Sequence, residues 1–351
     1  MNLGEARQQA YRNGFKSAAD QAARPWRLED GLPSNQIIRG NSIELLAALP
    51  EGWVDLVFAD PPFNIGYLYH NYEDKKSDAD YLKFSEDWMR AVWRALRPGG
   101  SFYLAIGDEF AADLAVIARR TIGFSMRNWI IWHYTFGQQT KKKFARSHTH
   151  IFYFTKGDDP AQITFNADAV RVASARQTVY ADSRANSKGK LPDDTWFLRP
   201  QVAAAEAAMF AADSDTWNVS RLCGTFNERE GWHGCQMPTA VLDRILKASS
   251  NEGDVVLDPF NGSGTTCVSA ARLGRKFVGI DQSEEYVAYA RQRIEHALEM
   301  HPNGDEQVFA KTRQSKVKTQ TDAFGRPRVE RKKRTPTNGR AAGRAAVRRA
   351  S

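Results

Sequence analysis

The chain has 351 residues, 42% of them hydrophobic and 26% charged, and its formal net charge is +8. This composition is sufficient for a complete buried core, but no apolar run reaches the roughly 18 residues of a membrane span, and the polar N-terminus lacks the apolar stretch of a signal peptide. The three cysteines have no paired spacing, which indicates a reducing, cytoplasmic compartment, and no complete set of metal ligands is visible.

The positive charge is concentrated at the C-terminal end. Residues 306–351 contain fourteen Lys and Arg against three Asp and Glu, so the rest of the chain is net acidic. Because it has few apolar residues, the segment 301–351 is predicted to be a basic, disordered tail. Such a tail favours weak contact with nucleic acid, and hence a nucleoid-associated protein, although a purely solubilising role is the alternative.

The first part of the chain alternates short apolar strands with amphipathic helices. A strand over residues 36–40, a helix over 42–49 and a strand over 54–59 precede a polar loop, 64–78, that is typical of a lid beside a ligand site. Apolar residues at three- and four-residue spacing then predict a helix over 81–96. The other elements predicted before residue 157 are the strands 101–106, 127–134 and 150–155 and the helix 110–121.

This alternation is interrupted once and then resumes. Residues 157–231 mix basic and aromatic side chains without helix or strand periodicity, which indicates an insertion outside the sheet. From Pro238 onward the predicted elements are a helix, the strand 255–257, the helix 265–273, the strand 276–280 and the helix 284–298. The pattern is typical of an α/β fold with a doubly wound, mostly parallel sheet.

A glycine-rich turn follows the strand that ends at Leu257. Cys267 stands where a dinucleotide fingerprint needs its third glycine, and no Gly-Lys-Ser/Thr follows as in a phosphate loop. The turn therefore indicates a nucleoside-type cofactor without phosphates, with the Asp281 carboxylate on its ribose hydroxyls. The alternative is a plain glycine turn before a helix. The turn residues predicted to bind the cofactor are Asp258, Pro259, Phe260, Asn261, Gly262, Ser263, Gly264 and Thr265.

A second turn, Asp60-Pro61-Pro62-Phe63, ends the strand over 54–59. At the carboxyl edge of an open α/β sheet, both turns can face one crevice. An aromatic amine is a poor nucleophile because its lone pair is delocalised, and hydrogen bonds to the Asp60 carboxylate and the Pro61 carbonyl would localise that pair. The prolines fix the backbone in advance, and Phe63 offers a stacking face for a base turned out of a duplex. A rigid turn with a capping aspartate is the alternative.

These turns resemble the motifs of the amino-group DNA methyltransferases that use S-adenosylmethionine, in the circularly permuted (beta) subclass, whose catalytic motif comes first. The resemblance spans residues 36–293. The turn from Asp60 to Phe63 is similar to the catalytic motif of adenine-N6 enzymes, since cytosine-N4 relatives usually carry Ser in place of Asp. The turn from Phe260 to Gly264 is similar to the cofactor loop, and Asp281 to the ribose-binding acid. Further cofactor contacts that the resemblance implies are Gln236 and Pro238 on the methionine part and Asn41 on the adenine.

The resemblance implies a site-specific DNA methyltransferase that moves a methyl group from S-adenosylmethionine to N6 of adenine in double-stranded DNA. It implies base flipping and direct transfer, without a metal. A cytosine-N4 methyltransferase, a catalytically inactive DNA-binding protein of the same fold and an RNA methyltransferase are the alternatives. The implied parts are an N-terminal segment (1–26), a catalytic half (27–156), a target-recognition insertion (157–231), a cofactor-binding half (232–300) and the tail (301–351).

Basic residues are the expected contacts to DNA phosphates. Some lie in a run between two predicted strands, where a solvated hairpin is the alternative, and others lie in the insertion. The implied partners are double-stranded DNA, a second copy of the chain in a homodimer and a cognate restriction endonuclease that acts separately, with no membrane. The expected DNA-binding residues are Lys141, Lys142, Lys143, Arg146, Arg184 and Lys188.

Overall fold

The computed structural model describes residues 31–67, 74–138, 141–142, 144, 146–178, 180–196 and 237–300, together with 320–321 and 327–328. The chain forms two compact units, Met1–Lys311 and Thr312–Ser351. In the second unit, β9 (Gln320–Thr321) and β10 (Pro327–Arg328) pair antiparallel, so these four residues of the predicted disordered tail are paired. The predicted N-terminal segment, 1–26, lies outside the described residues.

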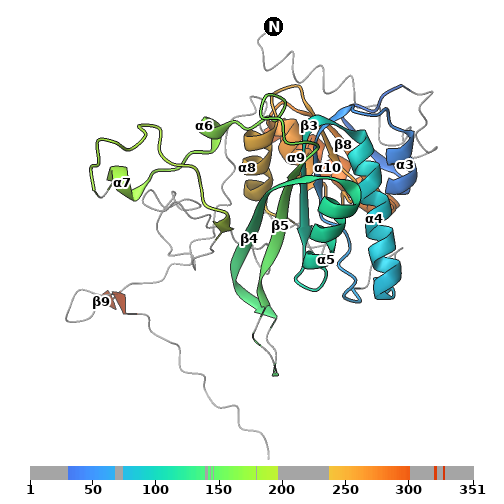
Figure 1. Cartoon of the computed structure of the whole chain (residues 1–351), viewed down its shortest axis with the longest axis horizontal. Helices are drawn as coiled ribbons and strands as arrows, with labels where there is room; N and C mark the ends of the chain where they lie inside the picture. Colours follow the sequence, from blue (N-terminus) through green and yellow to red (C-terminus); the bar gives the residue numbers. More distant parts are fainter. Residues whose placement is uncertain are drawn as a thin grey trace, which may run out of the picture. The chain divides into compact units, whose positions relative to one another are not determined.

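The first unit is built on one eight-stranded sheet with the order β1-β8-β7-β2-β3-β5-β4-β6 (Figure 1). Neighbours from β1 to β3 all pair parallel, and β5 is antiparallel to both β3 and β4. The prediction of a doubly wound, mostly parallel sheet is therefore confirmed. The strands are β1 (Gln36–Arg39), β2 (Val54–Ala59), β3 (Leu96–Ile106), β4 (Ser125–Gln138), β5 (Arg146–Thr155), β6 (Thr195–Trp196), β7 (Val255–Asp258) and β8 (Lys276–Asp281).

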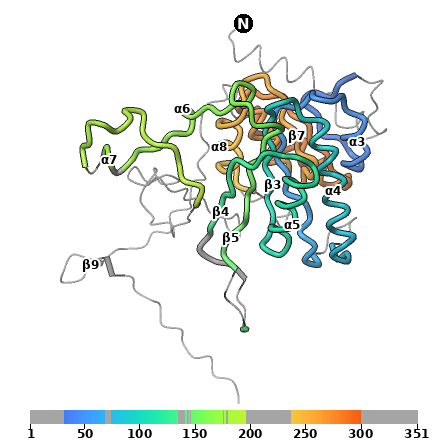
Figure 2. The backbone as a smooth tube through the Cα atoms, viewed as in Figure 1, coloured from blue at the N-terminus to red at the C-terminus, as the bar shows by residue number. Residues whose placement is uncertain are grey.

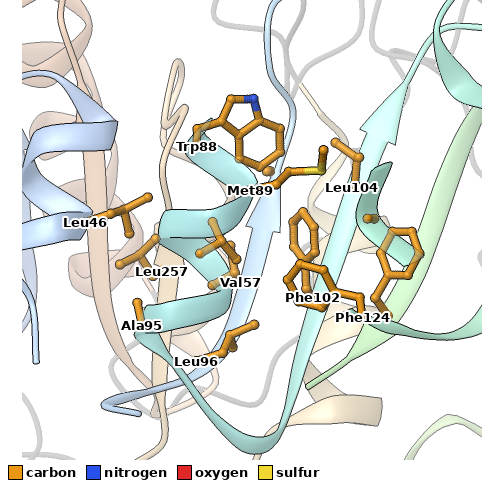
Figure 3. Close-up of a cluster of buried hydrophobic side chains, with 14 of the residues drawn as sticks. Leu46, Val57, Trp88, Met89, Ala95, Leu96, Phe102, Leu104, Phe124 and Leu257 are labelled. Carbon is orange, nitrogen blue, oxygen red and sulfur yellow. The ribbon is translucent and has the colours of Figure 1, made fainter. Parts of the chain in front are cut away.

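Helices cover both faces of this sheet and enclose two apolar clusters. Alternate residues of β2 enter different clusters: Phe58 packs with the face that carries α8, α9 and α10, and Val57 packs with the face that carries α3, α4 and α5. Figure 3 shows the second cluster, in which Trp88 and Met89 of α4 lie over the sheet. The helices are α3 (Ser42–Ala48), α4 (Asp78–Ala95), α5 (Ala111–Val116), α8 (Thr239–Ser249), α9 (Thr265–Arg272) and α10 (Glu284–Met300).

The strands β4 and β5 extend further than the sequence predicted. The last pair between β3 and β5 is Ile106 with His150, whereas β5 begins at Arg146 and pairs there with Gln138 of β4. The two strands therefore form a hairpin that continues past the end of β3 (Figure 2). The prediction placed these strands over the apolar residues alone, because beyond the sheet the hairpin no longer alternates apolar and polar residues.

The insertion also differs from its prediction. Thr195 and Trp196 form β6 and pair parallel with β4, so the prediction that residues 157–231 stay outside the sheet is wrong at this point. A two-residue edge strand is too short to produce a periodicity in the sequence. The insertion also contains α6 (Ala167–Val170) and α7 (Ala175–Thr178), and the predicted helix 110–121 is divided into α5 and a π-helix, η2 (Ile117–Ile122). Among the helices described, none has the length and apolar character needed to cross a membrane.

Candidate active site

The two predicted turns lie side by side at the carboxyl edge of the sheet. In the register of β2 with β7, Val57 pairs with Leu257, and Asp60 and Phe260 each come three residues later. On the other side of β7 lies β8, which ends at Asp281. Parallel strands end at the same edge, so the acidic turn, the glycine turn and Asp281 follow one another along it.

The glycine turn has a backbone that only glycine adopts readily. Gly262 has φ +46° and Gly264 has φ +77°, both in the left-handed region. A β-carbon on Gly264 would lie 2.8 Å from the β-carbon of Ala290 in α10. Gly264 is thus packed directly on α10, whereas Gly262 is partly exposed.

Two carboxylates from neighbouring strands hold the glycine turn. Asp281 accepts the backbone N–H of Gly262 at 2.9 Å and that of Ser283 at 2.8 Å. Asp258 accepts the N–H of Phe260 at 3.0 Å. The pKa of Asp258 is raised to about 7 and that of Asp281 is also raised, in both cases mainly by burial. Hydrogen bonds to the two carboxylates oppose part of this effect. Each acid therefore contributes to the shape of the turn.

Burial divides the predicted cofactor residues into two groups. Phe260, Gly262 and Asp281 are partly exposed, so they remain accessible to a ligand. Four polar side chains of the turn are instead enclosed, since each is at most 4% exposed. These enclosed side chains are Asp258, Asn261, Ser263 and Thr265, and the neighbouring Pro259 is buried as well.

Aromatic contacts join the glycine turn to the helix α4. The ring of Phe260 meets Trp88 edge-on at 5.1 Å between centroids and Phe84 at 6.3 Å. Both partners belong to α4, so the ring of the partly buried Phe260 is anchored in the core next to the glycine turn. The sequence identified Phe260 by its motif and gave no signal for these partners.

The acidic turn is held by contacts that the sequence did not reveal. Asp60 is partly exposed, and Pro61 is buried. The hydroxyl of Tyr81 donates to the Pro62 carbonyl at 2.7 Å. A β-carbon on Gly107 would lie 3.3 Å from Cδ2 of Phe63, so the glycine leaves room for the ring. Tyr81 was predicted only as an apolar position of a helix.

Two of the remaining predicted cofactor residues, Asn41 and Pro238, directly precede helices. The exposed Asn41 follows β1 and caps α3, where its side-chain oxygen accepts the N–H of Ile43 at 2.9 Å. The preceding Gly40 donates its N–H to the Asp281 carbonyl at 2.9 Å, which brings Asn41 to the same edge as the glycine turn. Pro238 is buried and precedes α8. Gln236 lies outside the described residues.

The predicted DNA-binding residues have different surroundings. Lys141 and Lys142 are exposed in the connection between β4 and β5, and Lys143 lies outside the described residues. The other three form ion pairs: Arg146 with Asp108 at 2.6 Å, Arg184 with Asp182 at 3.0 Å, and Lys188 with Asp168. In the described part of the chain, no group of three or more His, Cys, Asp or Glu side chains is arranged to hold a metal ion.

Comparisons with known proteins agree with this architecture. Residues 54–292 match the N6/N4 methyltransferase family, described as "DNA methylase". The chain is 32% identical to the Type II methyltransferase M.HpaI of Haemophilus parainfluenzae over 273 residues, 78% of either chain. It is 31% identical to the DNA adenine methyltransferase YhdJ of Escherichia coli over 288 residues, 81% of this chain and 90% of YhdJ.

One solved structure supports the fold. The cytosine-N4-specific PvuII DNA methyltransferase has a TM-score of 0.53 and 17% identity, covering 77% of this chain and 93% of its own. The match over residues 54–292 and the two relatives show that the chain belongs to the N6/N4 amino-methyltransferase family of DNA methylases. It is a DNA methyltransferase, and the cofactor of this family is S-adenosylmethionine.

Proposed function

We propose that the chain methylates N6 of adenine at a specific site in double-stranded DNA. The observation that carries this proposal is the placement of the turn Asp60-Pro61-Pro62-Phe63 on the strand next to the glycine turn. A methyl donor in one turn and a target amine in the other would then face the same edge of the sheet. Since this edge cannot reach a base inside a duplex, the target adenine must be turned out of the stack.

The residues around the glycine turn fit S-adenosylmethionine. The partly exposed Gly262 has no side chain to keep a ligand away, and the carboxylate of Asp281 is suited to accept hydrogen bonds from ribose hydroxyls. The ring of Phe260 is partly exposed, and Asn41 follows the neighbouring strand. Gln236 and Pro238 complete the proposed site at the methionine end. When bound, the cofactor supplies an electrophilic methyl group on its sulfonium.

Asp60 and Pro61 would act on the amine of the target base. Their carboxylate and carbonyl oxygens accept the two amine hydrogens, which localises the nitrogen lone pair. The Asp60 carboxylate is also the acceptor available for the proton that the amine releases on methylation. Phe63, fixed over Gly107, offers a face for the flipped base. Because these groups are held in place beforehand, their hydrogen bonds need little rearrangement during transfer.

Two observations support adenine over cytosine as the target. Asp60 gives this chain the form of the motif that resembles adenine-N6 enzymes. YhdJ, which is named an adenine methyltransferase, is similar over 81% of this chain. The test is to digest DNA to nucleosides after incubation with the protein and labelled S-adenosylmethionine. We expect label in N6-methyldeoxyadenosine; label in N4-methyldeoxycytidine would identify the cytosine enzyme. Cofactor binding without any labelled nucleoside would identify a catalytically inactive protein.

We further propose that the hairpin of β4 and β5 and the insertion 157–231 contact DNA. At the tip of the hairpin, Lys141, Lys142 and the fully exposed Phe144 face solvent, as phosphate- and base-contacting residues would. Arg146, Arg184 and Lys188 would exchange their ion pairs with Asp108, Asp182 and Asp168 for DNA phosphates.

We also propose two partners other than DNA. The Type II name of M.HpaI supports a cognate restriction endonuclease that acts separately. A homodimer follows from the resemblance, and light scattering at several protein concentrations tests it. The basic tail, 301–351, would add salt-dependent affinity for DNA and hence association with the nucleoid.

A further inference from the structure

A buried carboxylate holds the chain directly after the acidic turn. Asp74 is 3% exposed. Its carboxylate accepts the backbone N–H of Asn64 at 2.8 Å, of Ile65 at 3.2 Å and of Tyr67 at 2.9 Å. The N–H of Gly66 donates to the Asp74 carbonyl at 2.6 Å. Four consecutive backbone N–H groups therefore converge on one residue.

Asn64 makes a second link between the same two stretches of chain. Its backbone is left-handed, with φ +59°, a conformation that Asn tolerates better than most residues. Its side chain donates to the Lys76 carbonyl at 3.0 Å and accepts the Lys76 N–H at 2.7 Å. The next residue, Ser77, caps α4. The chain that leaves Phe63 is thus tied to the start of α4.

The acidic turn consequently has three successive anchors. Pro62 accepts the hydroxyl of Tyr81, the ring of Phe63 lies against Gly107, and the N–H of Asn64 donates to Asp74. None of these anchors uses Asp60 or Pro61, the two residues proposed to hold the amine. A buried carboxylate is costly unless its oxygens are satisfied, and here three N–H groups satisfy them.

We propose that Asp74 is a positioning residue for methyl transfer, acting through Asn64 on the turn from Asp60 to Phe63. This inference rests on the proposed function of that turn. The cofactor loop follows β7, and its described polar supports and helix packing come from Asp258, Asp281 and α10. Its Phe260 ring also contacts α4, but at Phe84 and Trp88 within the helix, whereas Asp74 and Asn64 hold the chain before the helix begins. A change at Asp74 should therefore alter the rate of transfer and leave cofactor affinity nearly unchanged.

The test measures kcat on duplex DNA for three variants of the full-length protein and for the wild type. Asp74→Asn keeps the shape of the side chain but has one acceptor oxygen, and Asp74→Ala has none. We expect kcat to fall in that order, by on the order of 100-fold for Asp74→Ala, because misplacement by about 1 Å costs about that much in rate. Asn64→Gly keeps the left-handed backbone and removes only the link to Lys76, so it should fold and lose about tenfold in kcat. Asp78→Asn, an exposed acid in the first turn of α4, is the control and should leave kcat unchanged.

Cofactor titration and kcat together decide the outcome. A lower kcat with an unchanged cofactor Kd supports the positioning role. Normal kcat in Asp74→Asn and Asn64→Gly, or a parallel loss of cofactor affinity and stability, overturns it. Asp60→Ala is measured alongside: if it is inactive while the other variants are normal, only the role of Asp74 is wrong. If Asp60→Ala still transfers methyl groups, the proposed function of the turn is wrong, and the positioning role falls with it.

Discussion

Replacing Gly264 by alanine measures how closely the cofactor loop is packed on α10. The new β-carbon would lie 2.8 Å from Cβ and 3.2 Å from Cα of the buried Ala290, where the helix backbone cannot yield easily. A left-handed conformation costs a non-glycine residue about 1–2 kcal/mol. Overpacking adds about 1–3 kcal/mol. We therefore expect the free energy of unfolding to fall by about 2–5 kcal/mol.

The chain offers a matched control at Gly253. Its φ is +87°, yet a β-carbon there would meet no atom within 4 Å, so Gly253→Ala carries only the conformational cost of about 1–2 kcal/mol. Urea unfolding gives the stability of both variants, and calorimetric titration gives their affinity for S-adenosylmethionine. The affinity should fall at least about tenfold in Gly264→Ala, corresponding to 1.4 kcal/mol, and stay unchanged in Gly253→Ala. Equal stability and equal affinity in the two variants would refute the close packing of the loop.

Three further predictions concern pH, DNA and the acidic turn. Because burial raises the pKa of Asp258 to about 7, the folded protein keeps a proton that the unfolded chain loses near pH 4. The stability from this group is complete below pH 4 and is lost as the pH rises to 7. Asp258→Asn should therefore remove this part of the pH dependence of the free energy of unfolding. The same slope of that free energy against pH in both proteins would contradict the prediction. The double variant Lys141→Ala/Lys142→Ala should lower the slope of log K for DNA against log salt by about two, whereas Lys276→Ala, exposed at the opposite edge of the sheet, should not. Equal slopes in these proteins would remove the hairpin tip from the DNA interface. Tyr81→Phe loses the hydrogen bond to Pro62 and should cost about 1 kcal/mol in urea unfolding together with part of kcat; wild-type values of both would show that the anchor is unimportant.

The sequence predicted the elements whose pattern is local. The strands that end at Ala59 and Asp258 are short apolar runs followed by unusual turns, and the helices around them have clear three- and four-residue spacing. Parallel neighbours then require both turns to meet at one edge, which the register of β2 with β7 shows. The sequence therefore predicted a turn at the carboxyl end of each strand, whereas the pairing of β2 with β7 is a long-range contact that the structure supplied.

Contacts between distant residues were not predictable in the same way. Tyr81 reaches Pro62 across nineteen residues, and its hydroxyl follows no periodicity. Asp74 lies in a polar loop where a buried acid has no distinguishing neighbour in sequence. The motif also marked Asn261 and Ser263 as cofactor contacts, and it gave no sign that both side chains are buried, because their burial depends on packing against distant parts of the chain.

Single-turnover transfer by Asp60→Ala tests the central claim most directly. The variant is mixed with duplex DNA and S-adenosylmethionine carrying a labelled methyl group, and the cofactor Kd is measured on the same sample. We predict a loss of at least about 100-fold in the transfer rate with an unchanged Kd, since Asp60 belongs to β2's turn and the cofactor loop to β7. Transfer at the wild-type rate would contradict the assignment of this turn to the target amine.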